Sequence, residues 1–386
     1  MGKIRVMIVD DAVVVRRLIT DALSADPDIE VVGTAPNGRI ALQKLTQLQP
    51  DVVTMDVEMP EMDGLTALSE LRRTHPKLPV IMFSTLTERG GQATLEALAR
   101  GATDYVTKPA NVGSVNEGLH RVREELLPKI RWLAGRGGLP SAPARSVPSG
   151  NPAAPAGNNA ARTHVPGPGP VPRSPVASRP KREPVVVDVI TIGVSTGGPV
   201  AIGKVFPRFP RDLPVPVLVV QHMPPVFTRL LADRLAATCQ MPVHEGAAGM
   251  RVEPGHIYIA PGGYHMVVKR DASGQVVIDT NTDPPENSCR PAVDVLFRSV
   301  ARVYGGRVLC AVLTGMGHDG MRGAEVIRDA GGFVIAQDEA TSVVWGMPGA
   351  VVHAGLADEV LPLDAIADAL VRRCRPPAQR PLSSVA

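Results

Sequence analysis

Three polar side chains of the kinds that cooperate in hydrolysis each come after an apolar run. Ser195 follows VITIGV, His222 follows VPVLVVQ, and Asp319 lies in the glycine-rich segment after RVLCAVL. A serine becomes a nucleophile when a histidine takes its proton, and a carboxylate fixes the tautomer of that histidine. Because the carboxyl ends of parallel strands meet at one edge of a sheet, we predict a catalytic triad there.

Other interpretations of this pattern are weaker. The segment GVSTG fits the G-x-S-x-G turn between strand and helix, but such turns also bind phosphate. No G-K-[ST] follows, which excludes a P-loop, and a dinucleotide fingerprint lacks its third glycine. His318 is a rival base, but as the neighbour of Asp319 it is expected to point elsewhere. The chain order Ser, His, Asp differs from that of α/β-hydrolases, which argues against a lipase-type fold.

A second set of polar residues follows apolar runs near the N-terminus. Asp10 and Asp11 end the first run, and Asp56 ends the third. Converging carboxylates repel one another unless they share a cation, and hard oxygen ligands suit Mg²⁺. Ser84 and Lys108 end the next two runs and would supply the hydroxyl and the ammonium group that a transferred phosphoryl group requires.

Strand-like and helix-like segments alternate around these residues. Residues 3–125 contain five such pairs, which right-handed crossovers would wind into a parallel sheet with a flavodoxin-like strand order. Residues 185–376 repeat the pattern, but the sequence predicts no particular order of the strands in their sheet. We therefore expect two doubly wound α/β domains. Between them, residues 134–184 are rich in Pro, Ala and Gly and are expected to form a disordered linker.

Composition excludes several classes of protein. The 386 residues carry a net charge of only +3, so no nucleic-acid partner is expected. Early aspartates argue against a signal peptide, and no apolar run is long enough for a membrane span, so we predict a cytoplasmic protein without membrane insertion. The four cysteines have no paired spacing and are expected to be reduced structural thiols.

The N-terminal motifs VDD, MDVEMPEMDG, FST and DYVTKP resemble a response-regulator receiver domain. The resemblance implies that a phosphohistidine donor, a chemotaxis histidine kinase, phosphorylates Asp56 with Mg²⁺ as cofactor. It further implies that the metal ion is bound by Asp10, Asp11, Asp56 and the backbone carbonyl of Glu58. Ser84 and Lys108 would contact the phosphoryl group, and Tyr105 would reorient on activation.

The C-terminal motifs GVSTGGP, QHMPPVFT, YIAPGGYH, DVLFRS and LTGMGHDG resemble the catalytic domain of chemotaxis protein-glutamate methylesterases. The resemblance implies that Ser195, His222 and Asp319 form the triad, and that the backbone of Met316, helped by Thr196, binds the oxyanion. No cofactor is expected for ester hydrolysis.

Joined, the two resemblances imply a monomeric serine hydrolase that phosphorylation activates. Its substrates would be glutamate methyl esters and glutamines on methyl-accepting chemoreceptors, and its activity would reset chemotaxis signalling. One alternative is a transcriptional regulator, which would need a helix-turn-helix and a basic face that residues 186–375 lack. The other is a signalling scaffold with an idle triad, which would bind receptors without hydrolysing them.

Overall fold

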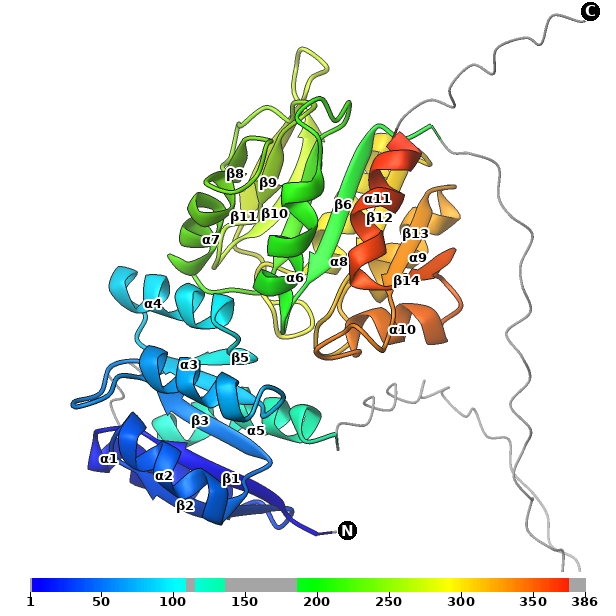
Figure 1. The fold of residues 1–386 in the computed structure, drawn as a ribbon. Coiled ribbons are helices and arrows are strands. Elements are labelled where there is room, and N and C mark those ends of the chain that lie inside the picture. Colours follow the sequence, from blue (N-terminus) through cyan, green and yellow to red (C-terminus); the bar gives the residue numbers. More distant parts are fainter. Residues whose placement is uncertain (1, 109–114, 136–185, 375–386) are drawn as a thin grey trace, which may run out of the picture. The chain divides into compact units, whose positions relative to one another are not determined.

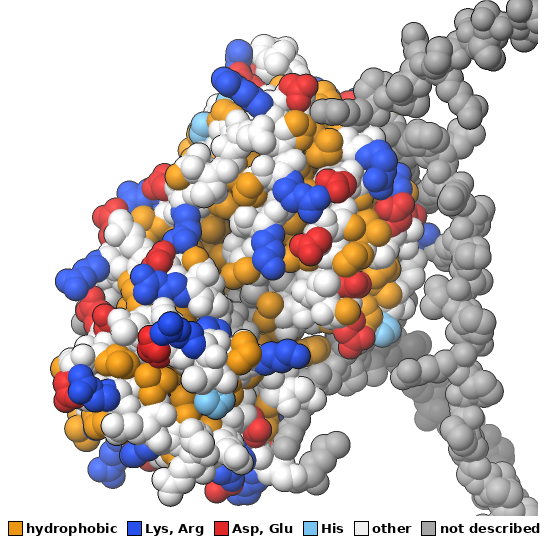
Figure 2. Space-filling model, viewed as in Figure 1, with side chains coloured by type: hydrophobic (Ala, Val, Ile, Leu, Met, Phe, Trp, Pro, Cys, Tyr) orange, Lys and Arg blue, Asp and Glu red, His pale blue; other side chains and the backbone are white. Residues whose placement is uncertain are grey.

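A computed structural model describes residues 2–108, 115–135 and 186–374. The expected linker lies outside these ranges apart from its first two residues. Within them, no helix combines the length and hydrophobicity that a bilayer crossing requires. Figure 2 shows acidic and basic side chains interspersed on the visible face, as the small net charge suggests.

The N-terminal domain is a five-stranded parallel sheet in the order β2-β1-β3-β4-β5, which confirms the predicted flavodoxin-like arrangement. Its strands are β1 (Ile4–Val9), β2 (Ile29–Ala35), β3 (Val52–Asp56), β4 (Val80–Ser84) and β5 (Asp104–Thr107). Its helices are α1 (Val13–Ser24), α2 (Gly38–Leu48), α3 (Gly64–Thr74), α4 (Glu88–Ala99) and α5 (Val115–Leu133).

Alternating side chains of the strands cover both faces of this sheet. Ile4, Val6 and Ile8 of β1 pack with buried residues of α1 and α5. Met7 and Val9 belong to the cluster that includes buried residues of α2 and α3. Because successive strand side chains point to opposite faces, one apolar strand supplies both layers.

The C-terminal domain contains a seven-stranded parallel sheet in the order β14-β13-β12-β6-β7-β9-β8. The strands are β6 (Val189–Val194), β7 (Val217–Gln221), β8 (Val243–Glu245), β9 (Ile257–Ile259), β12 (Val308–Val312), β13 (Phe333–Gln337) and β14 (Glu359–Leu361). An additional antiparallel hairpin, which the sequence analysis did not predict, pairs β10 (His265–Arg270) with β11 (Val276–Asn281).

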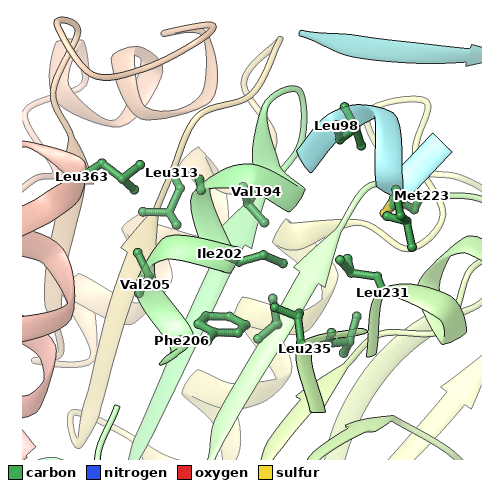
Figure 3. Close-up of a cluster of buried hydrophobic side chains, with 14 of the residues drawn as sticks. Leu98, Val194, Ile202, Val205, Phe206, Met223, Leu231, Leu235, Leu313 and Leu363 are labelled. Atoms are coloured by element: carbon green, nitrogen blue, oxygen red, sulfur yellow. The ribbon is translucent and has the colours of Figure 1, made fainter. Parts of the chain in front are cut away.

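Helices cover both faces of the larger sheet (Figure 1). The helices are α6 (Gly198–Val205), α7 (Phe227–Ala236), α8 (Val293–Tyr304), α9 (Met321–Asp329), α10 (Met347–His353) and α11 (Leu363–Cys374), with a 3₁₀ turn η1 (Phe206–Arg208) after α6. Ile192 on β6 lies in the cluster with α6, α7 and α11, part of which Figure 3 shows, whereas Val189 lies in the cluster with α8, α9 and α10. The expected doubly wound architecture is confirmed.

Candidate functional site

The carboxyl ends of β6 and β7 position Ser195 and His222. The backbone N–H of Ser195 donates to Thr314 O at 3.0 Å, and Gly198 N donates to Ser195 O at 2.7 Å, which makes a tight turn before α6. At the end of β7, the Gln221 side chain donates to Ser195 O at 3.0 Å and to His222 O at 3.2 Å. Gln221, which the sequence analysis missed, therefore joins the two turns.

Asp319 lies in the turn after β12, and its carboxylate is buried at the N-terminus of α8. Its Oδ2 accepts from His222 Nε2 at 2.8 Å and from Val293 N at 2.7 Å. Its Oδ1 accepts from Asp294 N at 3.0 Å. Burial opposes the charge of this carboxylate, but the hydrogen bond from His222 and the backbone donors outweigh burial and lower the pKa of Asp319. Asp319 is thus a fixed anion beside the imidazole.

The turn of residues 286–289 supports this pair from the other side. Glu286 and Cys289 exchange backbone hydrogen bonds of 2.9 and 3.1 Å, and φ is 53° at Asn287 and 62° at Ser288. Two consecutive left-handed residues are typical of a type I′ turn. The turn directs Asn287 Nδ2 to Asp319 Oδ1 at 2.9 Å and to Asp294 Oδ2 at 3.0 Å.

Asp294 is a second buried carboxylate next to Asp319. Its Oδ1 accepts from Gly323 N at 2.7 Å and from Gly320 N at 3.0 Å, which ties the start of α9 to α8. Burial, followed by the negative charge of Asp319, raises the pKa of Asp294 to about 6. No pattern in the sequence predicted a role for Asp294 or Asn287.

The second nitrogen of His222 faces a thiol. Cys289 Sγ lies 3.5 Å from His222 Nδ1, and Cys289 lines the same cavity as Ser195. Burial disfavours a charged ring, but the neighbouring Cys289 and Asp319 side chains outweigh it and raise the pKa of His222 to about 10. All four cysteines are free, as predicted. Cys310 and Cys374 are buried, whereas Cys289 lines the cavity that also contains Ser195.

Thr196 and Met316, the expected oxyanion donors, line this cavity with Ser195. In the described part of the chain, neither backbone N–H donates a hydrogen bond to another protein group. His318, the rival base, is not the partner of Asp319, whose carboxylate contacts His222 instead.

The N-terminal domain brings its acidic residues together at the ends of β1 and β3. Asp10, Asp11 and Asp56 each offer an oxygen, and these oxygens lie within 4.8 Å of one another. Burial, only partly offset by Lys108, raises the pKa of Asp56 to about 6. Three crowded oxygen donors, two of them buried, fit a hard divalent cation such as Mg²⁺, which would neutralise their charge.

The remaining predicted residues lie around this cluster. Lys108 Nζ lies 2.6 Å from Asp56 Oδ2 and 3.0 Å from Asp10 Oδ2. Ser84 donates to Gly90 O at 2.9 Å and lines the pocket over Asp56. The Glu58 carboxylate pairs with Arg89 at 3.0 Å, and Tyr105 lies on β5, with Lys129 Nζ 5.4 Å from its ring centroid.

Two family models match the chain. Residues 190–370 match the CheB methylesterase model, and residues 6–119 match the response regulator receiver domain model. A relative from Trichodesmium erythraeum, named protein-glutamate methylesterase/protein-glutamine glutaminase, is 48% identical over 97% of this chain and 99% of its own length. The chain belongs to the protein-glutamate methylesterase family. Both family resemblances seen in the sequence are therefore confirmed.

Other members of the methylesterase family extend the similarity. A relative of the same name from a Nocardioides species is 52% identical over 97% of this chain and 96% of its own length. The solved catalytic domain of the Thermotoga maritima CheB methylesterase is 42% identical, with a TM-score of 0.47, and covers 49% of this chain and 99% of that domain.

Proposed function

We propose that the protein is a serine hydrolase that demethylates glutamate methyl esters, and deamidates glutamines, on methyl-accepting chemoreceptors. The observation that carries the proposal is the hydrogen bond between His222 Nε2 and Asp319 Oδ2 in a site whose cavity also contains Ser195. Full-length similarity to proteins named protein-glutamate methylesterase/protein-glutamine glutaminase supports the substrate class.

The proposed reaction uses Ser195, His222 and Asp319 as a triad. Ser195 Oγ attacks the γ-carbonyl carbon while its proton passes to His222 Nδ1, and Asp319 stabilises the imidazolium through Nε2. The backbone N–H groups of Thr196 and Met316 hold the oxyanion. His222 returns the proton to the leaving methoxide, methanol departs, and water hydrolyses the acyl-enzyme by the same steps. With a glutamine side chain the leaving group is ammonia.

We further propose that phosphorylation of Asp56 by a histidine kinase activates the esterase. The acidic cluster would hold Mg²⁺ through Asp10, Asp11, Asp56 and the Glu58 carbonyl, and Mg²⁺ would neutralise charge during phosphoryl transfer. Lys108 and Ser84 would contact the phosphoryl group, and Tyr105 would respond to it. The protein would act as a monomer in the cytoplasm. Its proposed segments are the receiver domain (residues 3–125), the linker (residues 134–184) and the catalytic domain (residues 185–376).

The deciding experiment measures methanol release from methyl-labelled chemoreceptor membranes by the full-length protein. We expect release that rises with Mg²⁺ and a small-molecule phosphodonor. Ser195→Ala should abolish release, and Asp56→Asn should abolish only the stimulation. Absence of release by well-folded protein with several receptors would contradict the esterase assignment and favour the scaffold with an idle triad.

A further inference from the structure

Cys289 occupies the position beside the general base that a nucleophile would occupy. His222 offers Nε2 to Asp319 at 2.8 Å and Nδ1 to Cys289 Sγ at 3.5 Å. Within the described residues, no hydrogen bond joins Ser195 Oγ to the same ring. The His222 ring therefore connects the Cys289 thiol to the Asp319 carboxylate, which is the arrangement of a thiol–imidazole–carboxylate triad.

The thiol is held in this place by several anchors. Glu286 forms a two-pronged ion pair with Arg298, with contacts of 2.7 and 2.5 Å, at one end of the turn. Asn287 binds both buried carboxylates from the middle of the turn. Cys289 is the last residue of the turn, is half-buried and lines the cavity, with its Sγ 3.5 Å from His222 Nδ1.

We propose that Cys289 is a second nucleophile of the active site, which shares the His222 base with Ser195 and captures soft carbon electrophiles. The thiol gives its proton to His222 Nδ1, and the thiolate attacks the electrophilic carbon. With an alkyl halide, the carbon–sulfur bond forms as the carbon–halogen bond breaks, halide leaves with the bonding electrons, and the proton passes from His222 to solvent.

Two physical arguments support this proposal. A thiolate is the reactive form of cysteine, and an adjacent imidazolium stabilises it. The raised pKa of His222, which has Cys289 among its causes, favours that imidazolium at neutral pH. The captured group would lie in the cavity that Ser195 also lines, so alkylation would block access to Ser195.

The probe is iodoacetamide, used at pH 7 on the full-length protein, with the rate at each cysteine measured by peptide mass spectrometry. Cys239 is the internal control, because it is also half-buried and burial raises the pKa of its thiol. We expect Cys289 to react on the order of 10-fold faster than Cys239 or more. His222→Ala should bring the Cys289 rate near that of Cys239, whereas Ser195→Ala should leave it fast.

The labelling needs no ester substrate, so its outcome is separate from that of the proposed esterase. If wild-type Cys289 reacts no faster than Cys239, or if folded His222→Ala keeps the fast rate, the proposal is wrong. Asp319→Asn provides a second variant, which should also slow labelling. The predicted block of access to Ser195 rests on the proposed esterase. It is tested by measuring the fraction of methanol release that remains after iodoacetamide treatment, in wild type and in Cys289→Ser.

Discussion

Asn287 Nδ2 donates to Asp319 Oδ1 at 2.9 Å, on the opposite side of the carboxylate from His222. Removing this donor leaves a buried charge with one partner fewer, which costs about 1.5–3 kcal/mol for a charged hydrogen bond. We therefore expect Asn287→Ala to lower kcat about 10-fold or more, with a smaller effect on KM.

Steady-state hydrolysis of a glutamate methyl ester checks this expectation. Ser288→Ala is the matched control, because Ser288 lies in the same turn but is exposed. Equal kinetics for the two variants would show that Asn287 does not position Asp319.

The turn after Ser195 requires glycine at position 198. A Cβ there would lie 2.0 Å from Gln221 Oε1, and Gln221 holds the backbone carbonyl of Ser195. We expect Gly198→Ala to destabilise the catalytic domain by about 1–3 kcal/mol through overpacking and to reduce activity further by moving Ser195.

Gly203 gives the control on the same helix, since a Cβ at Gly203 meets nothing within 4 Å. Gly203→Ala should stabilise α6 by about 0.5–1 kcal/mol, because alanine favours helix more than glycine does. Chemical denaturation of both variants tests the contrast, and equal shifts in the two midpoints would argue against the predicted clash.

The pH dependence of hydrolysis should reflect the unusual environment of His222. A general base must be neutral to accept a proton, and the pKa of His222 is raised to about 10. Because the ring loses its proton only as pH approaches that value, kcat/KM should rise between about pH 7 and pH 10.

Cys289→Ser should move this rise to lower pH, because the Cys289 side chain is among the groups that raise the pKa of His222 and a neutral serine hydroxyl favours the imidazolium less. The measurement is the pH profile of kcat/KM for both proteins. Identical profiles would mean that Cys289 does not raise the pKa of His222.

Mg²⁺ should stabilise the receiver domain by relieving repulsion among Asp10, Asp11 and Asp56, whose oxygens lie within 4.8 Å of one another. A ligand that binds only the folded state raises the unfolding midpoint as its concentration increases. We expect the Tm to rise with Mg²⁺ in wild type and this rise to be much smaller in Asp11→Asn.

Asp21→Asn removes an exposed carboxylate of α1 that pairs with Arg17 outside the cluster. It should respond to Mg²⁺ as wild type does in scanning calorimetry. The same loss of response in both variants would point to a nonspecific charge effect.

The sequence alone determined which residues end the principal strands. Ser195, His222 and Asp319 follow β6, β7 and β12, which are adjacent in the sheet order β12-β6-β7. Parallel strands that are buried on both faces are continuous apolar runs, so their carboxyl ends can be located without a structure. The same reasoning located Asp10 and Asp56.

Only the tertiary structure decided what surrounds these residues. The turn of residues 286–289 lacks the glycine that normally marks a type I′ turn, and Asn287 and Cys289 lie far in sequence from the partners they contact. Local sequence patterns indicate which backbone conformation a segment prefers. Contacts between loops that are distant in sequence depend instead on how the folded sheet brings the ends of its strands together. The sequence therefore predicted Ser195, His222 and Asp319 as a triad, and the fold placed a thiol beside His222.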